Sequence, residues 1–307
     1  MKVDFHVHST ASDGTVPPER LALRAMVGGF RAIAISDHDN CDGTDAFVSA
    51  RYDPAEAESL LATRQKPYPK PNPAVPRIKG IELSIEPGVG YGKFHLLGLG
   101  IDPENSKLKA LLKRILEGRN GRNDRIIENF ERLGIHIPKD DIKEYAHGEV
   151  LARPHFANWL VKHGYSDDIA SAFAKYLLPE SPAETRAYEE RWHPPQEEAF
   201  DAIHSAGGIC VMAHPKYWRI DWRDAGPDPD VAAKELSRLK EIGLDGMEAM
   251  YQANKTHEDI AWSMLADRVG LLKSAGSDYH GANKPNIRLG MDVEEFFIAP
   301  LLERLGI

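Results

Sequence analysis

Residues 3–8 read Val3-Asp4-Phe5-His6-Val7-His8, an alternation of apolar and polar side chains that is typical of a strand. Successive side chains of a strand point to opposite faces, so Asp4, His6 and His8 share one face. Two imidazoles on one face can reach a common metal ion. The alternative is a pair of surface histidines, but the apolar half of the pattern indicates burial, and buried imidazoles without partners are costly. We therefore interpret His6 and His8 as metal ligands.

This strand is the first of seven short apolar segments in the chain. They are Val3–Val7, Ala32–Ser36, Arg77–Glu82, Phe94–Leu99, Gly208–Ala213, Asp245–Met250 and Leu271–Ala275. Helical patterns lie between most of them, beginning near Pro17, Gln196, Val231 and Thr256. Strands that alternate with helices predict an α/β fold with a mostly parallel sheet or barrel. Only a Pro/Gly-rich stretch, residues 87–92, joins the third and fourth segments, so a strict β/α repeat is broken there.

A long stretch in the middle of the chain lies outside this pattern. Residues 105–192 contain no convincing strand but several helical patches, which are Leu108–Leu116, Asn123–Leu133, His155–Lys162 and Ile169–Tyr176. We predict a helical insertion, or cap, at 105–192, and a barrel made of residues 1–104 and 193–307. A second irregular stretch, Pro-rich residues 68–76, reads as an extended surface loop.

The composition is that of a folded globular protein. The 307 residues include 42% apolar and 28% charged residues, which excludes wholesale disorder, and the net charge is −9. An acidic protein binds nucleic acid poorly unless it has a local positive site, and a cluster of divalent metals would be one. The two cysteines, Cys41 and Cys210, suggest a reducing compartment without a disulfide framework, although they could pair. Without an apolar run near the roughly 20 residues of a membrane span or a signal-peptide pattern, we expect a cytoplasmic protein and no membrane partner.

Residues of types that can bind metals occur at the ends of six of the seven strand segments. The set is His6, His8, Asp13, His38, Glu82, His95, His214, Asp278 and His280. Singly, each has another reading: Asp13 lies in a turn-forming Ser-Asp-Gly, and His214 precedes a proline. Together they are expected to meet, because active sites of parallel α/β folds gather at the carboxyl ends of the strands. Nitrogen and oxygen donors without sulfur suit Zn, Mn or Fe, and nine side chains suffice for two or three divalent ions.

Three more carboxylates accompany this set. Asp37 and Asp39 flank His38, and we interpret them as non-ligating supports of the metal site; the alternative is a cap for the next helix. Glu248 lies near the end of the remaining strand and is either a further ligand or a support.

In their order along the chain these motifs resemble the PHP (polymerase and histidinol phosphatase) superfamily. The matching strings are His6-Val7-His8-Ser9, Ser12-Asp13-Gly14, Ser36-Asp37-His38-Asp39, Gly80-Ile81-Glu82, Ala213-His214-Pro215 and Gly276-Ser277-Asp278-Tyr279-His280. Residues 148–165, with Arg153-Pro154-His155, resemble the insertion of a branch that acts on nucleoside 3′,5′-bisphosphates and on 5′ ends of short RNA. The resemblance implies a distorted seven-stranded (β/α) barrel with a small helical cap.

The resemblance also implies roles for single residues. One metal would take His6, His8, Glu82 and Asp278, a second Glu82, His95 and His214, and a third Asp13, His38 and His280. Arg153, His155 and Arg119 would bind substrate phosphate, for which the guanidinium fork is suited. For Arg119 the alternative is the solvated face of a basic helix. Two features depart from the family: the length of the Pro-rich loop 68–76, and Cys41 close to the metal site.

We thus expect a metal-dependent phosphoesterase in which a metal-bound hydroxide attacks phosphorus, with no residue assigned as general acid. Its substrate would be a small phosphorylated nucleotide, hydrolysed at the 3′-phosphate of a 3′,5′-bisphosphate, or a short oligonucleotide degraded from its 5′ end, and not long nucleic acid. Three alternatives remain. They are histidinol-phosphate hydrolysis, metal-dependent amide or lactone hydrolysis (which predicts a carboxylated lysine that we do not find), and a sensing module with a degenerate site. The sequence predicts no oligomeric state.

Overall fold

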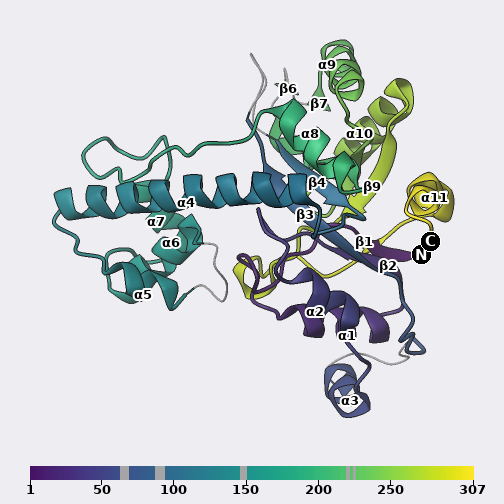
Figure 1. The fold of residues 1–307 in the computed structure, drawn as a ribbon, viewed down its shortest axis with the longest axis horizontal. Coiled ribbons are helices and arrows are strands. Elements are labelled where there is room, and N and C mark those ends of the chain that lie inside the picture. Colours follow the sequence, from purple (N-terminus) through teal and green to yellow (C-terminus); the bar gives the residue numbers. More distant parts are fainter. Residues whose placement is uncertain (63–68, 87–93, 146–150, 219–221, 224–225) are drawn as a thin grey trace.

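In the computed structural model of the protein, the described residues are 1–62, 69–86, 94–145, 151–218, 222–223 and 226–307 (Figure 1). Three sequence features therefore lie wholly or partly outside the described residues: the Pro/Gly-rich connection 87–92, Tyr68 of the Pro-rich loop, and the start of the 148–165 signature.

The strands are β1 (Lys2–Asp4), β2 (Phe30–Ile35), β3 (Arg77–Ser84), β4 (His95–Leu99), β5 (Ile209–Ala213), β6 (Trp222–Arg223), β7 (Gly226–Pro227), β8 (Gly246–Tyr251), β9 (Leu272–Gly276) and β10 (Met291–Asp292). The helices are α1 (Pro18–Val27), α2 (Thr44–Ser49), α3 (Pro54–Ala62), α4 (Ser106–Arg132), α5 (Lys139–Lys143), α6 (Arg153–Lys162), α7 (Ile169–Ala172), α8 (Gln196–Ser205), α9 (Pro229–Glu241), α10 (Thr256–Val269) and α11 (Glu295–Arg304). Short helical turns occur at Phe173–Leu177, Pro215–Trp218 and Gly281–Asn283.

The main sheet has eight strands in the order β10-β1-β2-β3-β4-β5-β8-β9. Most neighbours are parallel, but β4 is antiparallel to both β3 and β5, so the strict repeat is broken where the sequence predicted. The sheet nearly closes into a barrel, because the chain after β1 reaches β9: the Phe5 amide donates to the Ala275 carbonyl at 3.0 Å and the Asp278 amide to the His6 carbonyl at 2.9 Å. The α/β barrel-like architecture is therefore confirmed.

The prediction of seven strands needs one correction, because the main sheet has an eighth strand, β10. It pairs antiparallel with β1, Lys2 opposite Asp292. A two-residue strand is too short for an alternating pattern to reveal it, and its pairing depends on a long-range contact, the Gly290 amide donating to Asp4 at 2.8 Å. The four helices predicted around the barrel are present as α1, α8, α9 and α10.

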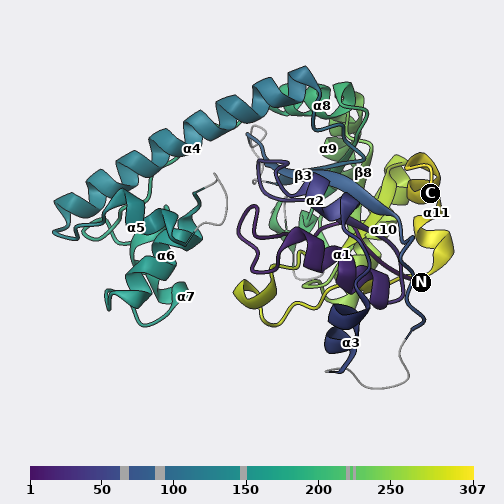
Figure 2. The ribbon, with the colours of Figure 1, turned by 60° about the horizontal axis from the view of Figure 1, so that its bottom comes forward.

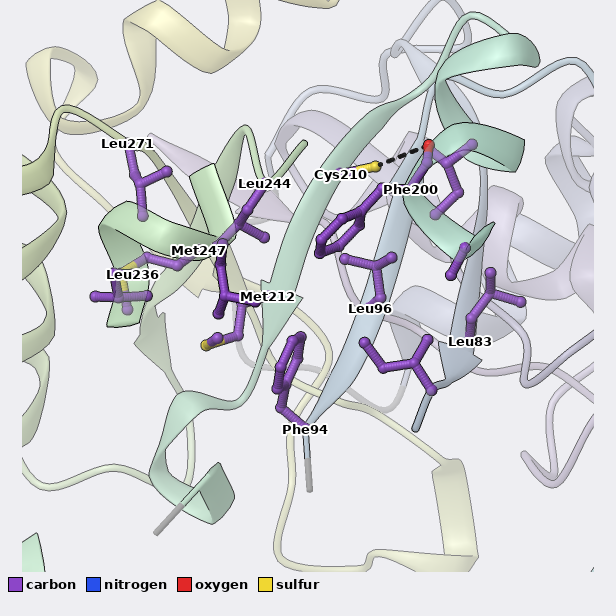
Figure 3. Close-up of a cluster of buried hydrophobic side chains, with 14 of the residues drawn as sticks. Leu83, Phe94, Leu96, Phe200, Cys210, Met212, Leu236, Leu244, Met247 and Leu271 are labelled. Carbon is purple, nitrogen blue, oxygen red and sulfur yellow. Dashed lines mark hydrogen bonds between the residues drawn. The ribbon is translucent and has the colours of Figure 1, made fainter. Parts of the chain in front are cut away.

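The barrel is covered by helices whose apolar faces pack against it. Figure 3 shows part of the largest core cluster, in which Leu96 and Met212 of the sheet lie near Phe200 of α8 and Leu236 of α9. Cys210 belongs to this cluster and its thiol donates to the Phe200 carbonyl at 3.7 Å. Both cysteines are free, so the two do not pair.

The insertion has a core of its own. Helix α4 is one continuous helix of 27 residues, whereas the sequence predicted two patches; Gly118 and Gly121 lie between the patches without ending the helix. The helix runs outward from the barrel, and α5, α6 and α7 gather at its far end (Figures 1 and 2). There Ile126, Phe130, Phe156 and Trp159 are buried together. The described residues between 105 and 192 contain no strand.

None of the helices among the described residues is both long and apolar enough to span a bilayer.

Candidate functional site

The ends of the strands bring the nine predicted metal-binding side chains into one cluster. Glu82, at the end of β3, lies at its centre and is fully buried. Its Oε1 lies 2.9 Å from both His95 Nδ1 and His214 Nε2, and its Oε2 lies 2.9 Å from His38 Nδ1 and 3.2 Å from His8 Nε2. One carboxylate therefore faces four imidazoles that come from different parts of the chain.

The other two carboxylates lie on the same side of the barrel. Asp278 Oδ1 is 3.4 Å from His8 Nε2 and 3.3 Å from His280 Nδ1, and Asp13 Oδ1 is 3.2 Å from His280 Nε2. Four groups within the cluster have ligand atoms within 4.8 Å of one another. They are His8, Asp13, His38 and His280; His6, Glu82 and His214; His6, His8 and Asp278; and His38, Glu82 and His95.

The cluster has the donors of a metal site. His8 Nδ1 and His214 Nδ1 are buried without hydrogen-bond partners, which is rare for buried polar atoms. The Nε2 atoms of His6 and His8 face each other at 3.1 Å, an arrangement that two imidazole lone pairs adopt around a shared cation. These residues fit divalent metal ions, and Zn, Mn and Fe are the classes that such donors prefer.

The pKa shifts within the cluster also indicate a site for cations. Burial opposes protonation of His38, yet the carboxylates of Glu82 and Asp13 raise its pKa to about 9. Burial also disfavours the anionic form of Glu82, yet His38, His6 and His95 hold its pKa well below the usual range. By contrast, burial and then His280 and His38 lower the pKa of His8 to about 4, which keeps this imidazole neutral and able to ligate. The carboxylates of the cluster thus attract any available cation.

The backbone at the cluster is strained. Asp39, His214 and Asp278 have φ angles of 53°, 30° and 59°, and they are the non-glycine residues with positive φ among those described. Left-handed backbone at residues other than glycine is costly and occurs mainly where function requires a side chain to be aimed.

Glu248 supports two of the imidazoles. Its Oε1 lies 2.9 Å from His6 Nδ1 and its Oε2 accepts the His214 amide at 2.5 Å. A Cβ at Gly276 would lie 2.0 Å from Glu248 Oε1, so only glycine leaves room for this carboxylate. The sequence left open whether Glu248 is a further metal ligand or a support of the ligands, and these contacts favour the support.

The sequence interpretation missed two further partners of the cluster. Asp278 Oδ2 accepts hydrogen bonds from the Tyr251 hydroxyl at 2.9 Å and from Lys284 Nζ at 2.6 Å. Both residues lie in segments next to a predicted ligand, but only the fold shows that they reach the carboxylate.

Asp37 and Asp39 take different positions. Asp37 accepts from the Ser9 amide at 2.7 Å and from the Ser12 hydroxyl at 2.6 Å, and so it fixes the turn that carries Asp13. Asp39 turns away from the histidines. Its carboxylate accepts from the Ser84 amide at 3.0 Å and from Arg119 Nε at 2.9 Å. Helix α2 begins after Gly43 without a side-chain cap, so neither aspartate caps it.

Asp39 is the centre of an arginine cluster beside the metal-binding residues. Arg191, in the segment that returns from the insertion, donates to Asp39 Oδ2 at 2.7 Å, next to Arg119 of α4. Arg119 is 6% exposed, so the alternative of a solvated helix face is wrong for this residue. Arg119, Arg191 and their neighbours Arg122 and Arg153 line a cavity of about 230 Å³.

This cavity, the arginine pocket, has unsatisfied donors. Arg122 Nη2 and Arg191 Nη1 are buried without hydrogen-bond partners, and burial together with three neighbouring arginines lowers the pKa of Arg122. Glu189 and Glu190 also line the pocket, but Glu189 accepts from Asn129 at 2.9 Å and Glu190 from the Tyr188 hydroxyl at 2.5 Å. The pocket is therefore suited to an anion.

Of the three predicted phosphate-binding residues, two lie in the arginine pocket and one does not. Arg119 and Arg153 line the arginine pocket, and His155 is not among its lining residues. His155 Nδ1 instead accepts the Ala152 amide at 3.1 Å at the start of α6. Arg122 and Arg191 were missed, although Arg122 follows Arg119 by one helical turn and could have been found by that spacing.

The arginine pocket and the metal-binding cluster are continuous, because Asp13, His38 and His95 line the pocket too. The two sites together can hold a molecule with more than one anionic group, one beside the metal-binding residues and one beside the arginines.

Comparisons with known proteins agree with this geometry. The model of the PHP domain family matches residues 4–242. A 3′,5′-nucleoside bisphosphate phosphatase of Chromobacterium violaceum is 31% identical over 283 residues, covering 91% of this chain and 87% of that protein. The 5′-3′ exoribonuclease Rnm of Escherichia coli is 30% identical over 291 residues, covering 90% and 84%.

The fold comparison gives a third match. The crystal structure of a putative metal-dependent phosphoesterase of Bifidobacterium adolescentis superposes with a TM-score of 0.74 at 26% identity, covering 98% of this chain and 96% of that one. With the family model matching most of the chain and a donor cluster that fits divalent metals, the chain belongs to the PHP domain family and is a metal-dependent phosphoesterase, a hydrolase of phosphoric esters.

Proposed function

We propose that this enzyme removes the 3′-phosphate from a nucleoside 3′,5′-bisphosphate. The observation that carries the proposal is the continuity of the metal-binding cluster with the arginine pocket through Asp13, His38 and His95. A phosphomonoester with a second phosphate on the same ribose would occupy both sites at once. The C. violaceum relative bears the name of this activity.

In this proposal the nine residues of the cluster hold two or three divalent ions of Zn, Mn or Fe. The groups are those implied by the family: His6, His8, Glu82 and Asp278 would hold one ion, and Glu82, His95 and His214 would hold a second. Asp13, His38 and His280 hold the third ion. When bound, such ions lower the pKa of a water molecule and offset the charge that develops on the phosphate oxygens.

The residues of the chain have separate tasks. Glu248 orients His6 and His214 around the reacting phosphate through the contacts described above. Arg122, Arg153 and Arg191 bind the phosphate that is not cleaved, and Asp39 orients Arg119 and Arg191. Water adds to phosphorus, the bond from phosphorus to the ribose oxygen breaks, and that oxygen leaves with a proton as the nucleoside hydroxyl. Residues 105–192 act as a cap that supplies all four arginines of the pocket.

The charge pattern of α4 favours a small substrate over a long nucleic acid. Two exposed basic side chains in its first half are paired with acids: Lys107 with Asp201 at 2.7 Å, and Arg114 with Glu198. A polymer is bound through free Lys and Arg residues that replace the counterions of successive phosphates. With these residues engaged and a net charge of −9, a mononucleotide or short oligomer suits the site better.

The second candidate is release of nucleotides from the 5′ end of short RNA. It is favoured by the similarity to the E. coli exoribonuclease, since a 5′-phosphorylated RNA would also present one phosphate to the arginines and the next to the metal-binding residues. The two activities need the same groups, but in RNA the phosphate beside the metal-binding residues is a diester that carries a further nucleotide.

A substrate panel tests the proposal. Metal-stripped protein is reloaded with Mn, Zn or Fe and assayed on adenosine 3′,5′-bisphosphate, a 5′-phosphorylated RNA oligomer, histidinol phosphate and a simple lactone. We expect the highest kcat/KM on the bisphosphate. A higher value on RNA would favour the second candidate, and turnover of histidinol phosphate or the lactone alone would contradict both.

A further inference from the structure

One aromatic side chain beside the metal-binding cluster is exposed in a way that its neighbours are not. Tyr217 lies in the short helical turn Pro215–Trp218, directly after His214, and is 49% exposed. Trp218, the next residue, is 1% exposed and packs edge-on against Phe94 at a centroid distance of 6.2 Å. The turn therefore buries one aromatic ring and presents the other to solvent.

The turn is anchored on both sides of Tyr217. Lys216 Nζ donates to the Ala253 carbonyl at 2.8 Å and lies 3.3 Å from Glu258 Oε2 of α10. The Tyr217 amide donates to the His214 carbonyl at 3.0 Å. Because residues 216 and 218 are both held, the exposed position of Tyr217 is set by the fold of the turn.

The Tyr217 ring borders the cluster. Its centroid is 5.4 Å from the His214 ring and 6.2 Å from the Tyr251 ring, both at steep interplanar angles of 68° and 77°. His214 contacts Glu82, and Tyr251 donates to Asp278. The Tyr217 ring thus contacts two residues, His214 and Tyr251, that would lie close to the reacting phosphate.

We propose that Tyr217 is a stacking platform for the aromatic ring of the leaving group, which for the proposed substrate is a nucleobase. An exposed ring that borders a phosphoester site can stack on any base, because every base has a π-face, and this selects nucleotides without reading their sequence. The identity of the ring as a nucleobase rests on the proposed function. The preference for aromatic over aliphatic leaving groups follows from Tyr217 alone.

The test compares aromatic with aliphatic substrates. Phenyl phosphate, adenosine 3′,5′-bisphosphate and glycerol 2-phosphate are assayed with wild-type, Tyr217→Ala and Tyr217→Phe protein. We expect Tyr217→Ala to lower the ratio of kcat/KM for aromatic over aliphatic esters about tenfold, mainly through KM, as for the loss of one base stack. Tyr217→Phe retains the ring and restores the ratio. Tyr165→Ala, at an exposed tyrosine after α6, keeps the wild-type ratio.

Equal losses on aromatic and aliphatic esters would overturn the proposal, because Tyr217 would then act only by supporting His214; an unchanged ratio would overturn it as well. Calorimetric binding of adenosine 5′-monophosphate and ribose 5-phosphate gives the same comparison without turnover, and Tyr217→Ala should weaken only the former. Tyr217→Ala could lower the ratio of kcat/KM for phenyl phosphate over glycerol 2-phosphate in an enzyme that does not hydrolyse the bisphosphate. That result would refute the proposed function but support the role of Tyr217 in stacking.

Discussion

The metal-binding cluster and the arginine pocket are adjacent, but their charges are unbalanced in opposite directions. In the cluster, three carboxylates face imidazoles, and two of them, Glu82 and Asp13, raise the pKa of His38 to about 9 against the effect of burial, so positive charge is in short supply. Four arginines line the pocket, two of them donate to Asp39, and two of the guanidinium nitrogens have no hydrogen-bond partner, so negative charge is in short supply. In neither region is the charge neutralised by the region's own side chains. We infer that the site as a whole is suited to bind metal cations and a phosphorylated substrate together.

The largest expected effect would come from breaking the cluster. His6→Ala and Asp278→Ala should each reduce kcat on any phosphoester by on the order of 10³-fold, because each removes a side chain that is proposed to hold a metal ion. Turnover and metal content measured on the purified variants check this.

The matched control is Asp201→Ala, which removes an exposed carboxylate paired with Lys107. Circular dichroism should show all three variants folded. Wild-type turnover by His6→Ala in the presence of added metal would remove His6 from the predicted ligand set.

A smaller effect is expected from the pocket, and only on substrates with a second phosphate. Arg122→Ala should raise KM for adenosine 3′,5′-bisphosphate about 10- to 100-fold, since a charged hydrogen bond to phosphate contributes about 1.5–3 kcal/mol. Phosphate should also raise the melting temperature of metal-free wild-type protein, by binding to the folded state. The variant should lose this shift in a thermal-melt assay.

Arg132→Ala, at an exposed arginine near the end of the same helix, should behave as wild type in both assays. If Arg122→Ala instead affected mono- and bisphosphorylated esters alike, the pocket would not be a separate phosphate site, and the contrast between the two regions would fail.

The smallest effect is expected from the support of the cluster. Glu248→Gln keeps the shape of the side chain but removes the charge that orients His6, and it should weaken metal binding by about tenfold. Competition with a chelator measures the affinity, and excess metal should restore turnover. Unchanged affinity would reduce Glu248 to a packing role; Glu241→Gln, at an exposed position of α9, serves as the control.

Much of the cluster could be predicted from the sequence because its residues follow strands, and strand ends meet on one side of a barrel. His6, Glu82 and His214 are far apart in the chain but lie together for this reason. The arginine pocket could not be predicted in the same way. Arg191 reaches Asp39 only because the chain returns from the insertion along α4, and no local pattern encodes that path.

Other parts were missed for equally physical reasons. Strand β10 has two residues and depends on a distant partner. Helix α4 contains two glycines, which weaken a helix, but it continues through both of them; a Cβ added at Gly118 would lie 3.5 Å from the Trp192 Cβ. The domain boundaries at 105 and 192, and the roles of the metal-binding residues, remain predictions for the experiments above.

The position of the insertion has a consequence for how the chain folds. Strands β4 and β5 are neighbours in the sheet, with Leu99 opposite Ile209, yet the entire insertion lies between them. Pairing two strands across so long a loop lowers the conformational entropy of the chain before the favourable contacts between the strands have formed. Helices α4 and α8, which contact each other through Lys107 and Asp201, bring the two ends of that loop together. Docking of α4 on α8 therefore shortens the loop that has to close when β4 pairs with β5.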